Sequence, residues 1–255
     1  MKKMAVLFGI LTVAGLAIAG CGTVFAHGTP TTETYNLTGF TGVDISSAFS
    51  YEITRANGYS ISVTSEDFDH IVVENEGNTL KIYRRGVDWT PFYYRPTVKI
   101  TMPTLTELTV SGASEGVATG FSGGSFKLDV SGASKLELTS INTTGLTGRI
   151  SGTSRVTGTV TVAGATDLDI SGASRADLSG SGQGLKLNVN GASRTELGEF
   201  TAETGEVSYN GASSGTINLS SRLDATVSGA SSLNLRGAAV IGRLDTTGSS
   251  SFHRK

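Results

Sequence analysis

The chain has 255 residues, of which 34 are Gly, 31 are Ser and 34 are Thr, and only one is Cys. Its formal net charge of −2 provides no basic surface for phosphates, so nucleic acid is not an expected partner. The single Cys excludes both a disulfide framework and a cluster of metal-binding thiolates.

The first twenty residues have the features of a signal peptide. Two lysines precede an apolar stretch, residues 4–19, which is shorter than the roughly 20 residues that a transmembrane helix needs. The stretch leads into Leu-Ala-Ile-Ala-Gly-Cys, which resembles the bacterial lipobox, whose Cys is lipidated and becomes the mature N-terminus. We therefore predict a lipoprotein signal peptide over residues 1–20 and acylation, including palmitate, at Cys21, which would anchor the protein to a membrane. Ordinary cleavage after Ala26 is the alternative.

Residues 21–34 are predicted to contain the lipidated Cys and a flexible tether. The stretch 27–33 is polar and includes one Gly, one Pro and three Thr, a composition typical of a linker. We expect the domain that follows to lie outside the cytoplasm, in the cell envelope. If the source is Gram-negative, the expected site is the outer membrane, because Gly22 stands where an Asp often retains lipoproteins in the inner membrane.

The domain is predicted to span residues 35–255 and to begin with irregular coils over residues 35–105. This first part contains short runs in which apolar and polar residues alternate, the pattern of strands with one buried face. No linker separates them from the sequence that follows, so we expect them to continue the same β-structure. The runs cover residues 43–45, 51–53, 59–63, 71–73, 80–83 and 98–100.

One segment of this first part, residues 84–97, contains the only Trp of the chain, three further aromatic side chains and three Arg. Aromatic and Arg side chains dominate the energetics of many interfaces, and aromatic faces also stack on sugar rings. The segment is therefore a candidate ligand-binding surface. The alternative is that it folds back to cover the end or side of the domain. The candidate binding residues are Trp89, Phe92, Tyr93 and Tyr94.

Residues 106–250 form one internal repeat. A four-residue tag, Ser-Gly-Ala-Ser or a close variant, occurs eight times at spacings of 18 to 20 residues, with period-two strand patterns before and after it. A unit this short cannot bury its apolar face alone, so successive units must stack. We predict an all-β fold, a single-stranded parallel β-helix (β-solenoid) with coils of about 20 residues. The tags begin at Ser111, Ser131, Ser151, Ser171, Asn190, Asn210, Ser228 and Thr247.

Stacking places residues of successive coils in columns along the solenoid. The column directly after the tags contains four successive cations, spaced to grip an anionic glycan or lipid head group. The alternative is that these cations form ion pairs that fix the register of the coils, because Glu137, Asp177 and Glu196 lie close enough to neutralise three of them. The candidate binding residues of this column are Lys135, Arg155, Arg175 and Arg194.

Several motifs together resemble a known protein family. They are Phe-Thr-Gly-Val-Asp-Ile at residues 40–45, Asn-Thr-Leu-Lys-Ile at residues 78–82, the strand at residues 98–105 that ends in Pro-Thr-Leu, and the serial tags. In this order they resemble the family of the putative auto-transporter adhesin, head GIN domain, over residues 35–250. The resemblance implies a bacterial envelope β-solenoid, often lipid-anchored, and it implies no catalytic residue.

A carbohydrate-active enzyme that acts on an acidic polysaccharide is the alternative function, because some parallel β-helices are enzymes of this kind. Asp129 and Asp169 would lie two coils, roughly 9.6 Å, apart, near the upper limit for an inverting pair. Arg149 would lie directly between them, which suggests an ion-paired ladder that lowers the pKa of both carboxyl groups and removes the general acid. The scattered His residues and the acidic cluster at residues 66–70 lack the spacing of a metal site, so we expect neither metal nor cofactor.

The sequence therefore predicts a non-catalytic, adhesin-like binding or scaffolding module of the cell envelope. Its expected partners are the membrane, through the lipid anchor, and a cell-surface glycan or an envelope protein. A structural spacer without a ligand is a third possibility. Exposed strands at the two ends of a solenoid could pair with another copy, so the sequence leaves the oligomeric state open.

Overall fold

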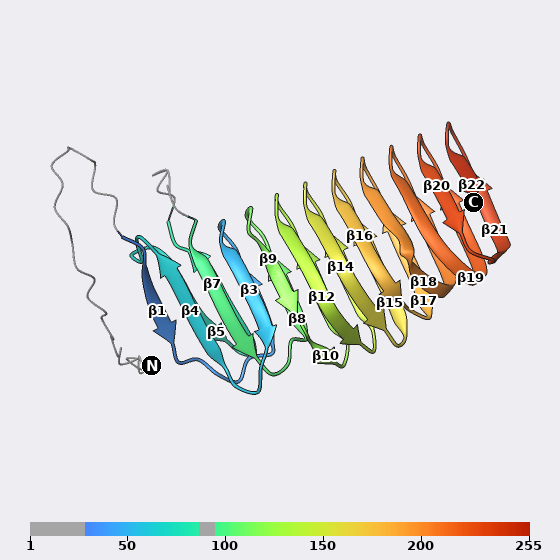
Figure 1. The fold of residues 1–255 in the computed structure, drawn as a ribbon. Coiled ribbons are helices and arrows are strands. Elements are labelled where there is room, and N and C mark those ends of the chain that lie inside the picture. Colours follow the sequence, from blue (N-terminus) through green and yellow to red (C-terminus); the bar gives the residue numbers. More distant parts are fainter. Residues whose placement is uncertain (1–28, 87–94) are drawn as a thin grey trace.

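The structure is a computed structural model, and it describes residues 29–86 and 95–255. These residues form twenty-two β-strands and no helix, so the described part contains no helical segment capable of spanning a membrane. Successive coils stack side by side and build an elongated solenoid (Figure 1). Pairing partners in the regular part lie about 20 residues apart, as Leu146 and Thr166 do, which confirms the predicted all-β solenoid.

The regular part of the solenoid begins shortly before the first tag and runs to the end of the described chain. Its strands are β8 (Glu107–Val110), β9 (Glu115–Thr119), β10 (Ser122–Gly123), β11 (Phe126–Val130), β12 (Lys135–Thr143), β13 (Leu146–Ile150), β14 (Arg155–Val162), β15 (Ala165–Ile170), β16 (Arg175–Ser181), β17 (Gly184–Val189), β18 (Arg194–Tyr209), β19 (Ser214–Val227), β20 (Ser232–Arg236), β21 (Val240–Thr246) and β22 (Ser251–Arg254).

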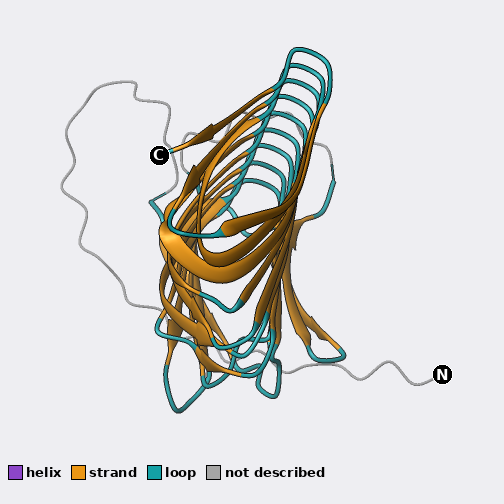
Figure 2. Ribbon diagram, turned by 90° about the vertical axis from the view of Figure 1, so that its right-hand side faces the viewer, coloured by secondary structure: helices purple, strands orange, loops and turns teal. Residues whose placement is uncertain are grey.

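The regular strands form two parallel sheets that face each other across the core (Figure 2). Strands that run into a tag, such as β11, β13 and β15, form what we call the pre-tag sheet. Strands that leave a tag, such as β12, β14 and β16, form the post-tag sheet. The long strands β18 and β19 continue through the corner opposite the tags, so each belongs to both sheets.

The alternation of apolar and polar residues determines which side chains enter the core. In β15, Leu168 and Ile170 point inward and are buried, whereas Asp167 and Asp169 point outward. Because neighbouring strands are in register, equivalent apolar residues stack into continuous buried columns, for example Val130, Ile150 and Ile170. Burial of such side chains stabilises a fold by about 1.5–3 kcal/mol each before chain entropy is counted.

The tags form the regular corner that joins the two sheets, visible as the stack of loops in Figure 2. Gly172 has a φ of +79°, a left-handed conformation that favours glycine. The N–H of Ala173 donates to the carbonyl of Gly152 in the previous coil at 2.8 Å, so the hydrogen-bond ladder continues around the corner. The last Ser of the tag, Ser174, is buried and donates to the same carbonyl at 3.3 Å. This corner accounts for the abundance of Gly and Ser.

The N-terminal part of the domain is less regular and includes antiparallel pairs. Strand pairs β1–β4, β4–β7 and β5–β6 are antiparallel, whereas β2 and β3 pair in parallel with their neighbours. The strands are β1 (Thr31–Tyr35), β2 (Gly42–Ile45), β3 (Ser50–Arg55), β4 (Ser60–Ser65), β5 (Ile71–Glu76), β6 (Thr79–Arg84) and β7 (Thr97–Met102).

The order of the coils at this end differs from the order of the chain. Strand β2 pairs with both β6 and β8, and β3 pairs with both β7 and β9. The coil of β2 and β3 therefore lies between the later coil of β6 and β7 and the first regular coil. The sequence did not predict this order, because apolar alternation identifies a strand and its buried face but not the strand that pairs with it.

Candidate functional site

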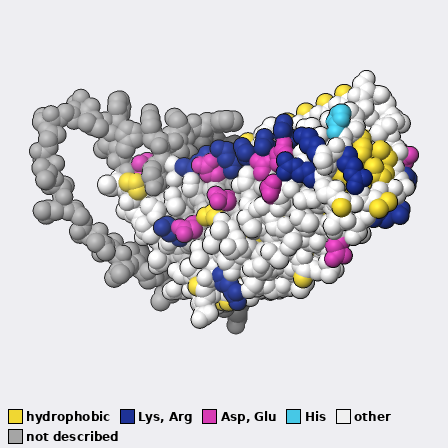
Figure 3. All heavy atoms as spheres, turned by 45° about the vertical axis from the view of Figure 1, so that its right-hand side comes forward, with side chains coloured by type: hydrophobic (Ala, Val, Ile, Leu, Met, Phe, Trp, Pro, Cys, Tyr) yellow, Lys and Arg dark blue, Asp and Glu magenta, His cyan; other side chains and the backbone are white. Residues whose placement is uncertain are grey.

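The four predicted cations lie side by side on the outer surface of the post-tag sheet. Lys135 pairs with Arg155, Arg155 with Arg175, and Arg175 with Arg194, on the successive strands β12, β14, β16 and β18. The predicted register is confirmed, and we call these four residues the cation column. Figure 3 shows Lys and Arg side chains in a band along one face, with Asp and Glu side chains beside them.

A second column follows two residues further along the same strands. Glu137 pairs with Thr157, Thr157 with Asp177, and Asp177 with Glu196. We call Glu137, Asp177 and Glu196 the acid column, and the surface that both columns form is the charged face. Side chains of residues i and i+2 on a strand share one face, so the two columns run next to each other.

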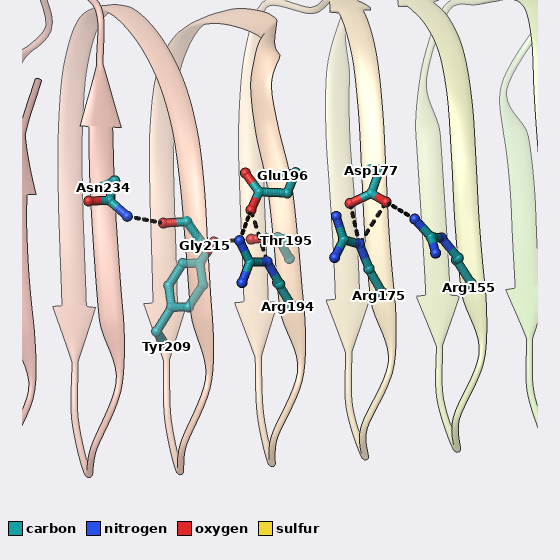
Figure 4. Close-up of polar contacts among 9 residues, drawn as sticks. All are labelled: Arg155, Arg175, Asp177, Arg194, Thr195, Glu196, Tyr209, Gly215 and Asn234. Atoms are coloured by element: carbon teal, nitrogen blue, oxygen red, sulfur yellow. Dashed lines mark hydrogen bonds and ion pairs between the residues drawn. The ribbon is translucent and has the colours of Figure 1, made fainter.

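Most of the cation column is engaged in ion pairs (Figure 4). Asp177 accepts from Arg175 Nε at 2.7 Å and from one terminal nitrogen of Arg155 at 2.9 Å, and so bridges two coils. Arg194 donates to Glu196 at 2.6 Å. The hydrogen bond from Asp177 raises the pKa of the Arg175 guanidinium above its ordinary value. Such exposed pairs contribute about 0–1 kcal/mol each, so a binding partner could exchange them at small cost.

Lys135 is an exception to the predicted pairing. Its ammonium lies 3.5 Å from Glu115, one coil away in the same column, and Glu115 also pairs with Arg95 at 3.2 Å. The expectation that Glu137 neutralises one of the four cations was therefore wrong, because within residues 29–86 and 95–255 Glu137 forms no ion pair. An equivalent residue one coil away lies only about 4.8 Å along the axis, closer than the residue two positions along the same strand, at about 6.6 Å.

Two shallow hollows lie along the charged face. One of about 560 Å³ is lined by Lys135, Glu137, Arg155 and Thr157. The other, of about 490 Å³, has small residues such as Gly158 and Gly198 in its lining. Its charged lining residues are Arg175, Asp177, Glu196, Glu199 and Arg236. Charged side chains that line an open hollow can bind a polar partner with a complementary charge pattern.

The Glu199–Arg236 pair beside the second hollow was not identified from the sequence. Arg236 donates to Glu199 at 3.0 Å, although the two residues are 37 positions apart. The register of β18 against β19 shifts between Leu197 and Thr201, and this bulge brings Glu199 within reach. The guanidinium of Arg236 lies where a side chain on Gly198 would otherwise project. The only sequence signal was the shortening of the tag spacing to 18 residues in the following coil.

The carboxylates considered for catalysis lie on the opposite, pre-tag sheet. Arg149 pairs in register with both Asp129 and Asp169, as predicted. However, no ion pair joins Arg149 to either carboxylate among the described residues, so the expected ion-paired ladder is wrong at this point. The hollow of about 280 Å³ around them is also lined by Lys127, Asp167 and Lys186, which makes three cations and three carboxylates.

Several predicted residues fall outside the described part of the structure. These are the proposed lipidation site, Cys21, and the aromatic candidates Trp89, Phe92, Tyr93 and Tyr94. Among residues 29–86 and 95–255, no group of three or more His, Cys, Asp or Glu side chains is arranged to hold a metal ion.

Comparisons with known proteins agree with this fold. A crystal structure of a putative adhesin from Parabacteroides distasonis superposes with a TM-score of 0.79 at 14% identity, over 89% of this chain and 98% of that one. A putative adhesin from Parabacteroides merdae gives a TM-score of 0.79 at 14% identity, over 89% and 97% of the two chains. A putative lipid binding protein from P. distasonis also gives 0.79, at 19% identity and with the same coverage.

At these identities the likeness to solved structures shows the fold alone, and none of these descriptions names an enzymatic activity. No curated protein matches the sequence significantly. The family model described as putative auto-transporter adhesin, head GIN domain, matches residues 39–239, which is most of the chain. The stacked coils, the tag corner and this match together place the chain in the head GIN domain family.

Proposed function

We propose that this protein is a non-catalytic, adhesin-like binding or scaffolding module, held on the outside of the cell by a lipid on Cys21. Its contact surface is the charged face of the post-tag sheet. The observation that supports the proposal is the cation column, which lies on the outer surface beside the acid column and two hollows. The family description, an adhesin head domain, and the adhesin-like neighbours support a binding role.

The charges of this face favour a protein of the envelope as the partner over an acidic glycan. The four cations of the column are balanced by four carboxylates, those of Glu115, Glu137, Asp177 and Glu196. A polyanion would be attracted by the four cations and repelled by the four carboxylates. Because these exposed charges lie close together, the two effects largely cancel. A protein surface can offer both signs of charge in a matching pattern, and such complementarity gives specificity.

We expect the double variant Arg155→Ser/Arg194→Ser to lose at least tenfold in binding to isolated cell envelopes and to remain folded. Asp177 keeps Arg175 as a partner in this variant, and each lost pair is worth only about 0–1 kcal/mol. The measurement is binding of the purified soluble chain, from Gly22 onward, to envelopes of the host bacterium, with thermal unfolding recorded for each variant.

The matched control is Lys127→Ser/Lys186→Ser, which removes two cations from ion pairs on the pre-tag sheet. We expect this control to bind like the parent. Protease treatment of the envelopes should abolish binding and periodate treatment should not. Binding that survives protease but not periodate would indicate a glycan partner. Release of new reducing ends would indicate the enzyme, and no binding by the parent would favour a spacer without a ligand.

A further inference from the structure

We propose that the charged face binds the same face of a second copy of this chain, in a two-fold symmetric dimer. The inference rests on the proposed function, because it names the partner of the same surface. The two-fold axis runs parallel to the solenoid, midway between the cation column and the acid column. An interface of this kind uses one surface patch on both copies, so the patch must complement itself.

The arrangement of charges on each strand provides that complementarity. Where a coil carries a charge pair, the cation is at position i and the carboxylate at position i+2. Rotation by 180° about the proposed axis exchanges the two columns and leaves each residue at the level of its own coil. In each coil that carries a charge pair, the cation then faces the carboxylate of the equivalent coil in the other copy. The pairs are Lys135 with Glu137, Arg175 with Asp177, and Arg194 with Glu196, each formed twice.

The remaining coils of the face are compatible with this pairing. In each of these coils, positions i and i+2 hold either one charged and one neutral residue or two neutral residues. The rotation therefore places no charged residue opposite a like charge at the same level of the other copy. Glu137, which has no ion pair within the described residues, gains Lys135 of the second copy. The other facing positions are Thr97 and Lys99, Ser50 and Glu52, Glu115 and Val117, Arg155 and Thr157, Ser214 and Thr216, Ser232 and Asn234, and Ser251 and His253.

The opposite face of the solenoid lacks this property. On β15 of the pre-tag sheet, Asp167 and Asp169 occupy the two outward positions of one coil. The same two-fold operation there would place carboxylates against carboxylates at the centre of the face, and directly opposed like charges are destabilising. Self-complementarity is therefore specific to the charged face of the post-tag sheet.

The dimensions and orientation of the face also suit a dimer. Ten strands at about 4.8 Å, with side chains about 20 Å across the sheet, offer roughly 900 Å² per copy, close to the ~800 Å² per partner of a standard interface. An axis parallel to the solenoid keeps both N-terminal strands β1 at the same end of the dimer (Figure 1). Two lipid anchors on Cys21 could then enter the same membrane.

The experiment is sedimentation velocity of the purified soluble chain, from Gly22 onward, alone and in mixtures of charge variants. The parent should form dimers in 20 mM NaCl and associate at least tenfold more weakly in 500 mM NaCl, because salt screens exposed pairs. An all-cation variant, Glu137→Lys/Asp177→Lys/Glu196→Lys, and an all-acid variant, Lys135→Glu/Arg175→Glu/Arg194→Glu, should each be monomeric. An equimolar mixture of the two should form a heterodimer.

A second variant keeps the test valid if charge inversion disturbs folding. This variant exchanges the two charges on each of three strands and so keeps opposite charges next to each other within each chain. Its substitutions are Lys135→Glu/Glu137→Lys, Arg175→Asp/Asp177→Arg and Arg194→Glu/Glu196→Arg. This variant should dimerise with itself as the parent does, and should not form heterodimers with the parent.

A parent that stays monomeric in 20 mM NaCl at every concentration would overturn the dimer. So would heterodimers between the parent and the exchanged variant. Loss of the dimer alone would leave the proposed function standing if the monomer still binds envelopes through Arg155 and Arg194. Failure of envelope binding by a chain that dimerises would overturn the envelope partner and not the dimer.

Discussion

Gly172→Ala should lower the free energy of unfolding by about 3 kcal/mol or more, the largest effect we expect from a single methyl group. Gly172 has a φ of +79°, and a non-glycine residue in this region costs about 1–3 kcal/mol. A Cβ atom there would also collide with the carbonyl of Gly152, which accepts the hydrogen bond from Ala173. Backbone in a stacked corner cannot move without disturbing the coils on both sides.

The measurement is urea and thermal unfolding of the purified chain from Gly22 onward. The matched control is Gly184→Ala, in the next coil, where an added Cβ would have only an ordinary contact, 3.9 Å from Thr204 Oγ1. The control should change stability by less than about 0.5 kcal/mol, as surface substitutions usually do. Equal stability of the two variants would contradict the role assigned to the tag glycines.

Gly215→Ala should destabilise the protein by about 2–3 kcal/mol, because it overpacks the core at a site shaped around one tyrosine. Tyr209 is fully buried. The equivalent positions in the two neighbouring coils hold the smaller side chains of Val189 and Val227. Its hydroxyl is 2.5 Å from the hydroxyl of Thr195, and burial raises the pKa of Tyr209 well above its usual range. An added Cβ on Gly215 would collide with both hydroxyl groups.

A double-mutant cycle tests this interpretation. Tyr209→Val restores the side chain of the neighbouring coils and removes the collision with the tyrosine, while the contact with Thr195 remains. Gly215→Ala should therefore cost at least about 1 kcal/mol less in that background. Unfolding of the parent, both single variants and the double variant in urea measures the coupling. Additive effects of the two substitutions would show that Gly215 is constrained by something other than Tyr209.

The charged face was largely predictable from the sequence because the tags recur at nearly constant spacing. When the spacing is constant, the residue after each tag must stack on its equivalent, so the row from Lys135 to Arg194 followed from counting. The carboxylate partners of these cations were only partly predictable from the sequence. Asp177 and Glu196 pair as expected, whereas Lys135 pairs with Glu115 in the adjacent coil. Alternation along one strand does not indicate which of several carboxylates within reach a flexible Lys side chain will contact.

Repeat spacing and residue alternation were enough to establish the all-β solenoid, the position of its corners and the two columns of the charged face. These depend on a period and on inward and outward alternation, which are local properties of the chain. Two features became clear only from the folded chain: β2 lies between β6 and β8, and a bulge in β18 brings Glu199 to Arg236. Both features depend on which strand pairs with which and in what register. Contacts between residues distant in the chain determine that pairing.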